Sequence, residues 1–341
     1  MQNRFSGFLL QATLFMYLLY KAISFSLWIN IDRQFPLLPI LAIPDKLLQH
    51  LDLVVNSLSI VFVLLIALFP RRKFILLSFI IIELLSLALD QMRWQPLSFQ
   101  VIILFTVVYF SPRKTMLFLY AVLVATYFYS GLNKLNPGFT NFIWSKALLS
   151  DWLHIPGEIA YYKWIKLSGY SIGIGEIVLG LGLLTHWRKY AQIGLMLMHI
   201  SILAFLLNTG KNAAIIPWNI LMILYLGYFW LTESQLSIRY LWKPISTRLL
   251  MIVLFVLPTL RFVDAYPPYF SYDIYSGNSK YAFLYTDDKR YDSKADQRFT
   301  DYYIKDRKYA VSMTDWALQE LKVPFPPDTR LFYQLKDELD Y

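Results

Sequence analysis

The sequence predicts an all-α polytopic membrane helical bundle of about nine transmembrane helices, followed by a small extracytoplasmic α+β tail. Hydrophobic residues make up 57% of the chain and charged residues 16%, whereas soluble domains carry about 25% charged residues. Apolar segments of membrane-spanning length recur through residues 1–262. Clusters of Lys and Arg follow every second apolar segment, which is typical of a fixed orientation in a bilayer.

The predicted transmembrane domain covers residues 1–262, and residues 263–341 form the tail. About 20 apolar residues cross a hydrocarbon core that is ~30 Å thick. By this measure the spans lie at 7–29, 53–69, 74–90, 97–111, 115–133, 169–186, 190–208, 213–231 and 247–262. The first segment is too long for a signal-peptide core and has no small-residue cleavage site, so we expect it to be retained.

The basic clusters set the expected orientation, because translocation disfavours Lys and Arg. They are Arg71-Arg72-Lys73, Arg113-Lys114, Arg188-Lys189 and the loop with Arg239, Lys243 and Arg248. Their side is then cytoplasmic, as is the N-terminus, and the tail is extracytoplasmic. We expect a multi-pass protein of a cell membrane, most simply the bacterial cytoplasmic (inner) membrane. The net charge of +9 lies mainly beside the spans, so the lipid bilayer is the expected partner and nucleic acid is not.

The absence of cysteine excludes several kinds of site. Disulfides, thiolate nucleophiles, iron–sulfur clusters and cysteine-based zinc sites all require it. We expect no metal site.

Two outer connections are long. Residues 30–52 hold three prolines, so no continuous helix runs through them. Residues 134–168 combine Trp and Tyr with lysines, which favours short helices along the outer membrane interface.

The tail has a different character from the rest of the chain. Residues 280–286 and 309–312 have strand-like patterns. Residues 315–321 and 329–339 have helical patterns, the second with leucines four residues apart along one face. A segment as short as residues 263–341 is close to the lower limit for an independent hydrophobic core. We therefore expect the tail to pack against the membrane domain.

Ionisable groups inside spans are costly, and they usually face the protein interior or a water-filled cavity. Lys21, Glu83, Glu176 and His199 are the candidates. The last three fall near mid-membrane, where they can form either a proton relay or polar binding site, or a structural hydrogen-bond cluster. The glycines around Glu176 are spaced for close helix packing, with 173/180 and 175/182 each seven residues apart.

A compact polar segment, Asp90–Pro96, lies between the third and fourth predicted spans. Asp90 and Arg93 can pair within one helical turn, and Pro96 can begin the next helix. A lipid headgroup or a quinone ring can dock here against Trp94. The alternative is an interfacial turn clamped by an ion pair.

Lys134 ends the fifth predicted span at the outer face. Partial desolvation there favours a neutral amine, which can act as a base. The alternative is a lysine that snorkels to the interface.

The segment Ser130-Gly-Leu-Asn-Lys-Leu-Asn-Pro137 resembles the hallmark of the HTTM (horizontally transferred transmembrane) domain family, related to vitamin K-dependent γ-glutamyl carboxylase. The resemblance implies nine spans, an extracytoplasmic tail and a quinone or vitamin K-like ligand. It also implies that Lys134 matches the lysine taken as the base, with Asn133 in place of a preceding lysine.

Two further stretches carry weaker resemblances. Residues 168–206 are similar to DoxX/MauE-type membrane proteins, and residues 269–277 resemble the sequence that follows the spans in bacterial HTTM-like proteins. The carboxylase commonly has an Asn-His pair before the fourth span, where Arg93 is the nearest counterpart here. The chain also lacks the large lumenal domain, so protein carboxylation is not expected.

Three functions stay open at this point. The first is an enzyme that acts on a lipid-soluble, quinone-like molecule, with Lys134 as base and Arg93 and Asp90 assisting. The second is a non-catalytic scaffold or component of an envelope complex, with a protein partner. The third is a proton-coupled transporter that uses Glu83, Glu176 and His199, although no inverted repeat supports it.

Overall fold

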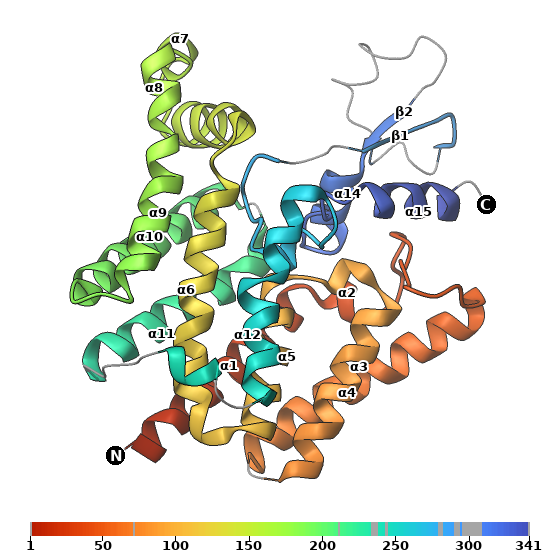
Figure 1. Ribbon diagram of the computed structural model, residues 1–341. Helices are drawn as coiled ribbons and strands as arrows, with labels where there is room; N and C mark the ends of the chain where they lie inside the picture. The colour runs from red at the N-terminus through yellow and green to blue at the C-terminus, as the bar shows by residue number, and fades with distance from the viewer. Residues whose placement is uncertain are drawn as a thin grey trace.

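A computed structural model describes residues 2–70, 72–210, 212–232, 238–242, 245–278, 282–289, 294 and 309–339. The fold is nearly all-α (Figure 1). Its α-helices are α1 Gln2–Ile23, α2 Phe25–Trp28, α3 Asp45–Leu68, α4 Lys73–Leu89, α5 Pro96–Phe110, α6 Thr115–Asn133, α7 Gly157–Ala160, α8 Lys163–Ser168, α9 Tyr170–Gly182, α10 Arg188–Thr209, α11 Ile216–Thr232, α12 Ile245–Phe255, α14 Met313–Glu320 and α15 Thr329–Leu339.

Shorter helical elements connect these helices. They are η1 Gln91–Arg93, η2 Pro112–Lys114, η3 Phe139–Trp152, η4 Ala213–Ile215, η5 Ile238–Trp242, η6 Leu257–Val263 and η7 Tyr269–Ser271. Of the residues named in the sequence predictions, Arg71, Lys243 and Lys280 lie outside the part of the chain that the structure describes.

Helices lie over all nine predicted spans, and four of the described helical segments are long and apolar enough to cross a membrane. These four are Asp45–Leu68, Pro112–Asn133, Arg188–Thr209 and Ala213–Thr232. Gly7–Ile23 and Pro96–Phe110 are apolar but shorter. The chain therefore has the helices of a membrane protein.

Two predicted spans are shorter as helices than expected. The segment 169–186 is helical only from Tyr170 to Gly182. In the segment 247–262, α12 ends at Phe255 and the short helix η6 follows. Pro258 lacks a backbone N–H, and its ring clashes with the preceding turn, so a continuous α-helix stops there.

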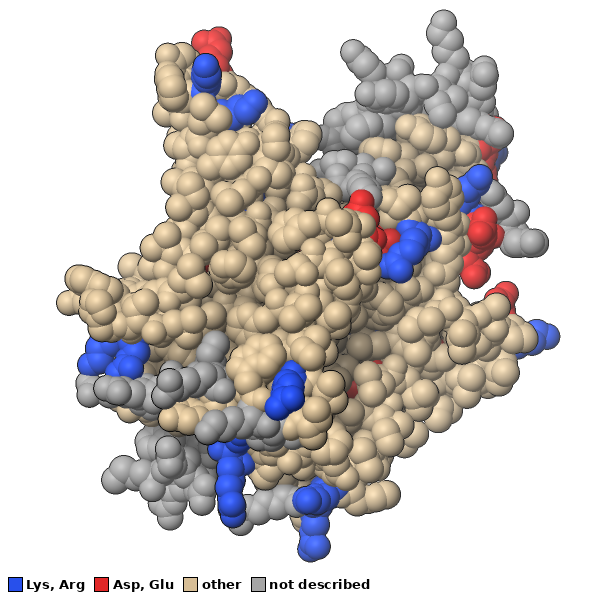
Figure 2. All heavy atoms as spheres, in the orientation of Figure 1, with Lys and Arg blue, Asp and Glu red and all other residues tan. Residues whose placement is uncertain are grey.

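The two ends of the helix bundle differ in charge. Figure 2 shows Lys and Arg without acidic neighbours along the lower edge of the visible face, the side where α1 begins, whereas higher up acidic and basic side chains are mixed. In Figure 1 the tail and the short helices α7 and α8 stand at the opposite, upper end. This distribution agrees with the predicted gathering of basic residues on one side.

Helix α6 forms the centre of the bundle (Figure 1). Its residues are buried on nearly every side, including the continuous run from Phe118 to Tyr127. A helix that is apolar on all sides belongs in the interior of a protein. By contrast, α3 buries one polar stripe, Asp52, Asn56 and Ser59, and exposes apolar residues on the other side.

Small residues set the contact between α6 and α9. A Cβ atom on Gly131 would lie 2.5 Å from the carbonyl oxygen of Gly173, so the two backbones nearly touch. Gly180 packs in the same way against Tyr127. The glycine spacing also suggests that all four glycines share one helix face, which is wrong, because Gly175 faces open space and Gly182 faces Ala191 on α10. Residues two apart on a helix point in very different directions.

The tail contains a two-stranded antiparallel sheet, β1 Phe283–Thr286 and β2 Tyr309–Ser312, followed by α14 and α15. Helix α14 begins two residues earlier than predicted, because Ser312 caps it by accepting a hydrogen bond from the Asp315 amide at 3.3 Å. The tail packs on the connection that precedes α3. Phe35 contacts Trp316 at a ring-centroid distance of 4.9 Å, and Glu320 accepts a hydrogen bond from the Phe35 amide at 2.9 Å.

Candidate functional site

Lys134 follows α6 directly and forms a buried ion pair with Glu176 of α9. The Lys134 Nζ atom lies 2.9 Å from Glu176 Oε2 and donates to Ser130 Oγ at 2.5 Å. Lys134 is 8% exposed and Glu176 is 4% exposed. The snorkelling interpretation of Lys134 is therefore wrong: its amine points into the protein and shares a site with a carboxylate.

A second set of polar groups continues from this pair along α6. Tyr127 and Lys134 are seven residues apart and lie on the same helix face. The Tyr127 hydroxyl lies 2.9 Å from His199 Nε2, and His199 Nδ1 lies 2.8 Å from Asn219 Oδ1. The Asn219 amide nitrogen donates to the Ile215 carbonyl, which fixes the direction of its amide. His199 therefore carries its proton on Nδ1 and accepts from Tyr127 at Nε2.

Glu83 belongs to a different cluster, between α1, α3 and α4. It accepts hydrogen bonds from Tyr17 at 2.5 Å and from Ser59, and it pairs with Lys21 at 3.3 Å. Lys21 also lies 3.4 Å from the centroid of the Trp28 ring. The charges of Lys21 and Glu83 cancel, and both side chains have further polar or aromatic partners. Among the described residues, no hydrogen bond or ion pair joins Glu83 to Glu176 or His199, so the three do not share one hydrogen-bonded site.

The polar segment before α5 is a buried clamp. Arg93 Nη1 lies 2.6 Å from Asp52 Oδ1, and Arg93 donates to the carbonyl oxygens of Leu27 and Ser86. The predicted contact with Asp90 is present but long, at 3.9 Å, because Asp90 binds Arg33 at 2.7 Å. The sequence reasoning missed Asp52 and Arg33, although the polar stripe along α3 was a usable signal for Asp52.

These contacts bear on the assisting roles expected for Arg93 and Asp90. Both side chains are fully buried and engaged in ion pairs. No contact within the described residues brings either one to Lys134. The geometry therefore favours the clamp interpretation of this segment. Pro96 begins α5, as predicted.

Trp94 does not present an open ring to a ligand. Its indole stacks on Phe270 with ring centroids 5.2 Å apart, and its N–H donates to the Leu87 carbonyl. A headgroup or a quinone ring would have to displace Phe270 to dock there.

The two stretches singled out at 127–139 and 269–277 lie against each other. Asn133 donates to the Ser271 carbonyl at 2.8 Å, and Asn136 donates to the Ser276 carbonyl at 2.8 Å. Gly277, at φ +73°, fits directly against the backbone of Gly138. Asn133 thus holds the start of the tail onto the end of α6, beside Lys134.

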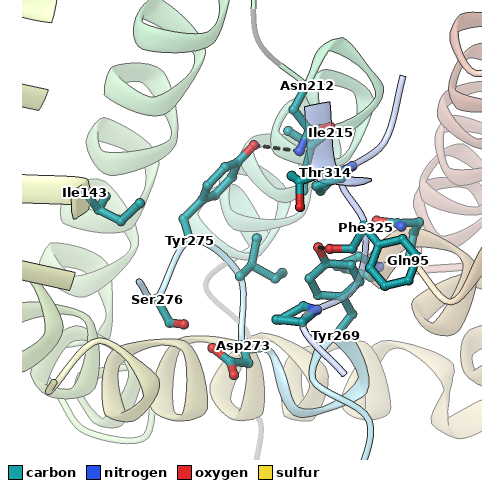
Figure 3. Close-up of a pocket in the computed structure, with 14 residues that line it drawn as sticks. Gln95, Ile143, Asn212, Ile215, Tyr269, Asp273, Tyr275, Ser276, Thr314 and Phe325 are labelled. Carbon is teal, nitrogen blue, oxygen red and sulfur yellow. Dashed lines mark hydrogen bonds between the residues drawn. The ribbon is translucent and has the colours of Figure 1, made fainter. Parts of the chain in front are cut away.

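A cavity of about 170 Å³ lies where the tail covers the upper ends of the helices (Figure 3). Its walls come from the turn before α5, from η3, from the loop before α11 and from the tail. Tyr275 and Asn212 meet in this wall, where the Asn212 amide donates to the Tyr275 hydroxyl at 2.8 Å.

No group of three or more His, Asp or Glu side chains suited to a metal ion occurs among the described residues. Comparison with protein families, curated proteins and solved structures finds no match.

Proposed function

We propose that this chain is a multi-pass membrane protein that acts on a lipid-soluble, quinone-like molecule at the outer membrane face, with Lys134 as the base. The observation that carries the proposal is the buried Lys134–Glu176 pair, with Ser130 as a third partner. A buried ion pair is a poor source of stability, because removing two charges from water costs about as much as their attraction returns. The pair differs from the Arg93–Asp52 clamp because a lysine, unlike an arginine, can lose its proton and act as a base.

The pair offers a direct proton transfer. Glu176 can take the ammonium proton of Lys134 across the 2.9 Å contact, which leaves a neutral amine beside a neutral carboxylic acid. The amine can then accept a proton from a hydroxyl group of the substrate, which leaves the ammonium beside the substrate oxyanion and the still-protonated Glu176 carboxylic acid. When Glu176 releases its proton to water, the ammonium again pairs with a carboxylate. In a low-dielectric site the neutral form of the pair avoids the desolvation of two charges.

The proposed topology has nine spans, a cytoplasmic N-terminus and an extracytoplasmic tail. Because the chain has no cysteine, single cysteines can be introduced without removing any others. We expect His154→Cys, before α7, to react with an impermeant maleimide on intact cells. His186→Cys, in the turn before α10, should react only after permeabilisation. Labelling of His186→Cys on intact cells would refute this orientation.

The test of the substrate class is chemical. The full-length protein, purified in mild detergent, should release a quinone-type molecule into organic solvent, identified by mass spectrometry. Amounts near one molecule per chain support the proposal. Amounts no greater than those from an unrelated membrane protein prepared in parallel contradict it.

One observation favours a second candidate, a non-catalytic scaffold. The asparagines of the 130–137 segment hold the tail, since Asn133 and Asn136 bind the carbonyl groups of Ser271 and Ser276. A segment whose main task is to present the tail to an envelope protein would need the same contacts. The two candidates differ in the role of Lys134. An enzyme needs its amine as a base, whereas a scaffold needs only its positive charge.

A further inference from the structure

Helix α8 extends α9 beyond the end of α6 that Lys134 follows. Gly169, between α8 and α9, keeps a helical backbone with φ −56° and ψ −30°, and Figure 1 shows α8 above α9. Gly173 of α9 touches Gly131, close to the end of α6. At the helical rise of ~1.5 Å per residue, α8 therefore lies roughly 5–12 Å beyond that end.

That distance matches the headgroup layer of a bilayer. Helix α6 has 19 residues, or about 28 Å, close to the ~30 Å thickness of a hydrocarbon core. Together with the turn before it, α6 is long and apolar enough to cross a membrane. The headgroup layers add about 5–8 Å on each side of the core. With α6 across the core, α8 stands largely among the headgroups of the leaflet at this end.

The exposed side chains of α8 suit this layer. Helix α9 exposes an apolar stripe that includes Ile174 and Val178, on the side away from its contact with α6. The stripe continues on α8 through Leu167 and Trp164, which are 38% and 66% exposed, at the spacing of one helix face. Tyr162, just before α8, is also exposed. Trp and Tyr are enriched at headgroup depth, where one edge of the ring is wet and the rest is apolar.

Two lysines of α8 add positive charge at the same depth. Within the part of the chain that the structure describes, neither Lys163 nor Lys166 forms an ion pair. The Lys163 ammonium lies 5.5 Å from the centroid of the Trp164 ring. The element η3 holds α8 from the side, since the Trp144 indole N–H donates to the Ile165 carbonyl at 2.8 Å. At headgroup depth the anionic groups available to such lysines are lipid phosphates.

We propose that α8 is a phospholipid-binding surface, with Lys163 and Lys166 on the phosphate groups and with Trp164 and Leu167 against the apolar region below them. An ammonium donates short, charge-assisted hydrogen bonds to phosphate oxygens, and the lysine stems cover apolar surface. In the proposed orientation this leaflet is the outer one, but the depth of α8 relative to α6 is the same in either orientation. The surface is separate from the Lys134–Glu176 pair, so the proposal holds whether or not Lys134 is a base.

The depth of α8 is measured with single nitroxide labels on the full-length protein in nanodiscs of phosphatidylglycerol and phosphatidylcholine. The label is placed at Leu167→Cys, and the references are Val178→Cys in the stripe of α9 and Tyr333→Cys on α15, which is 67% exposed. Collisions with oxygen, which dissolves in lipid, are compared with collisions with a water-soluble nickel chelate. The oxygen-to-nickel ratio at Leu167→Cys should fall between the two references. A ratio equal to either reference overturns the proposal, as do rare collisions with both reagents, which would mean that protein covers α8.

The lysine contacts are tested by counting lipids. Native mass spectrometry of protein released from the same nanodiscs gives the number of phosphatidylglycerol molecules retained per chain. Lys163→Gln/Lys166→Gln should retain fewer of them than the wild type. The matched control is Lys322→Gln/Lys336→Gln, which removes two exposed lysines of the tail and should retain as many as the wild type. Equal retention by the two double variants overturns the proposal, and size exclusion checks that both are folded.

Discussion

Replacing Arg93 by methionine is expected to destabilise the protein by about 3–5 kcal/mol, because it leaves the buried Asp52 carboxylate without its cation. Arg93 is fully buried, pairs with Asp52 of α3 at 2.6 Å, and donates hydrogen bonds to carbonyl groups of α2 and α4. Methionine fills much of the same volume but supplies no donor. The measurement is thermal unfolding in detergent, together with the folded fraction recovered by size exclusion.

Two further variants show whether charge or packing causes the loss. Arg113→Met removes an exposed arginine at the opposite end of α5 and should leave stability unchanged within about 0.5 kcal/mol. The double variant Arg93→Met/Asp52→Asn should recover part of the loss, since the carboxylate left unpaired is gone. A double variant no more stable than Arg93→Met alone would show that the ion pair is not the cause.

The second large effect is expected at the crossing of α6 and α9. Gly131→Ala should cost about 1–3 kcal/mol, because the new methyl group would lie 2.5 Å from the Gly173 carbonyl oxygen and 2.9 Å from the Ile177 backbone nitrogen. Backbone atoms cannot move aside as a flexible side chain can. The helices must separate, and this also lengthens the contact between Lys134 and Glu176. Thermal unfolding in detergent again measures the cost.

Gly175→Ala is the matched control for this crossing. It lies on α9, two residues from Gly173, and nothing lies within 4 Å of the position that its Cβ would take. Alanine favours a helix over glycine by about 1 kcal/mol, so this variant should be as stable as the wild type or slightly more so. If Gly175→Ala is as damaging as Gly131→Ala, the close contact is not what limits α6 and α9.

The sequence was sufficient to place the helices, because hydrophobic run length and basic turns depend only on local composition. It also marked Glu176 and Lys134 as separate candidates. It did not show that they pair, since they are 42 residues apart and their meeting depends on which faces of α6 and α9 touch. The Gly131–Gly173 contact brings those faces together, and glycine spacing alone does not reveal its partner on the other helix.

The partners of other ionisable residues also depend on how the helices pack in three dimensions. Glu83 and His199 are both expected near mid-membrane from the sequence but lie in different clusters, because α4 faces α1 and α3 whereas α10 faces α6 and α11. The expectation that Asp90 is the main partner of Arg93 followed from their sequence spacing. In the structure Asp52, from a separate helix, reaches the guanidinium more closely.

The most direct test of the central claim compares Lys134→Arg with Lys134→Ala. Arginine keeps the positive charge beside Glu176 but cannot serve as a base near neutral pH. Both variants are assayed for thermal stability and for turnover, measured as the rate at which dissolved oxygen oxidises the added hydroquinone form of the quinone-type molecule that the wild type releases, a reaction that deprotonation of its hydroxyl group accelerates. If Lys134 is the base, Lys134→Arg folds with the stability of the wild type and yet loses turnover of that molecule, as Lys134→Ala does. If Lys134→Arg retains full turnover, Lys134 acts only as a cation that holds α6 to α9, and the claim is wrong.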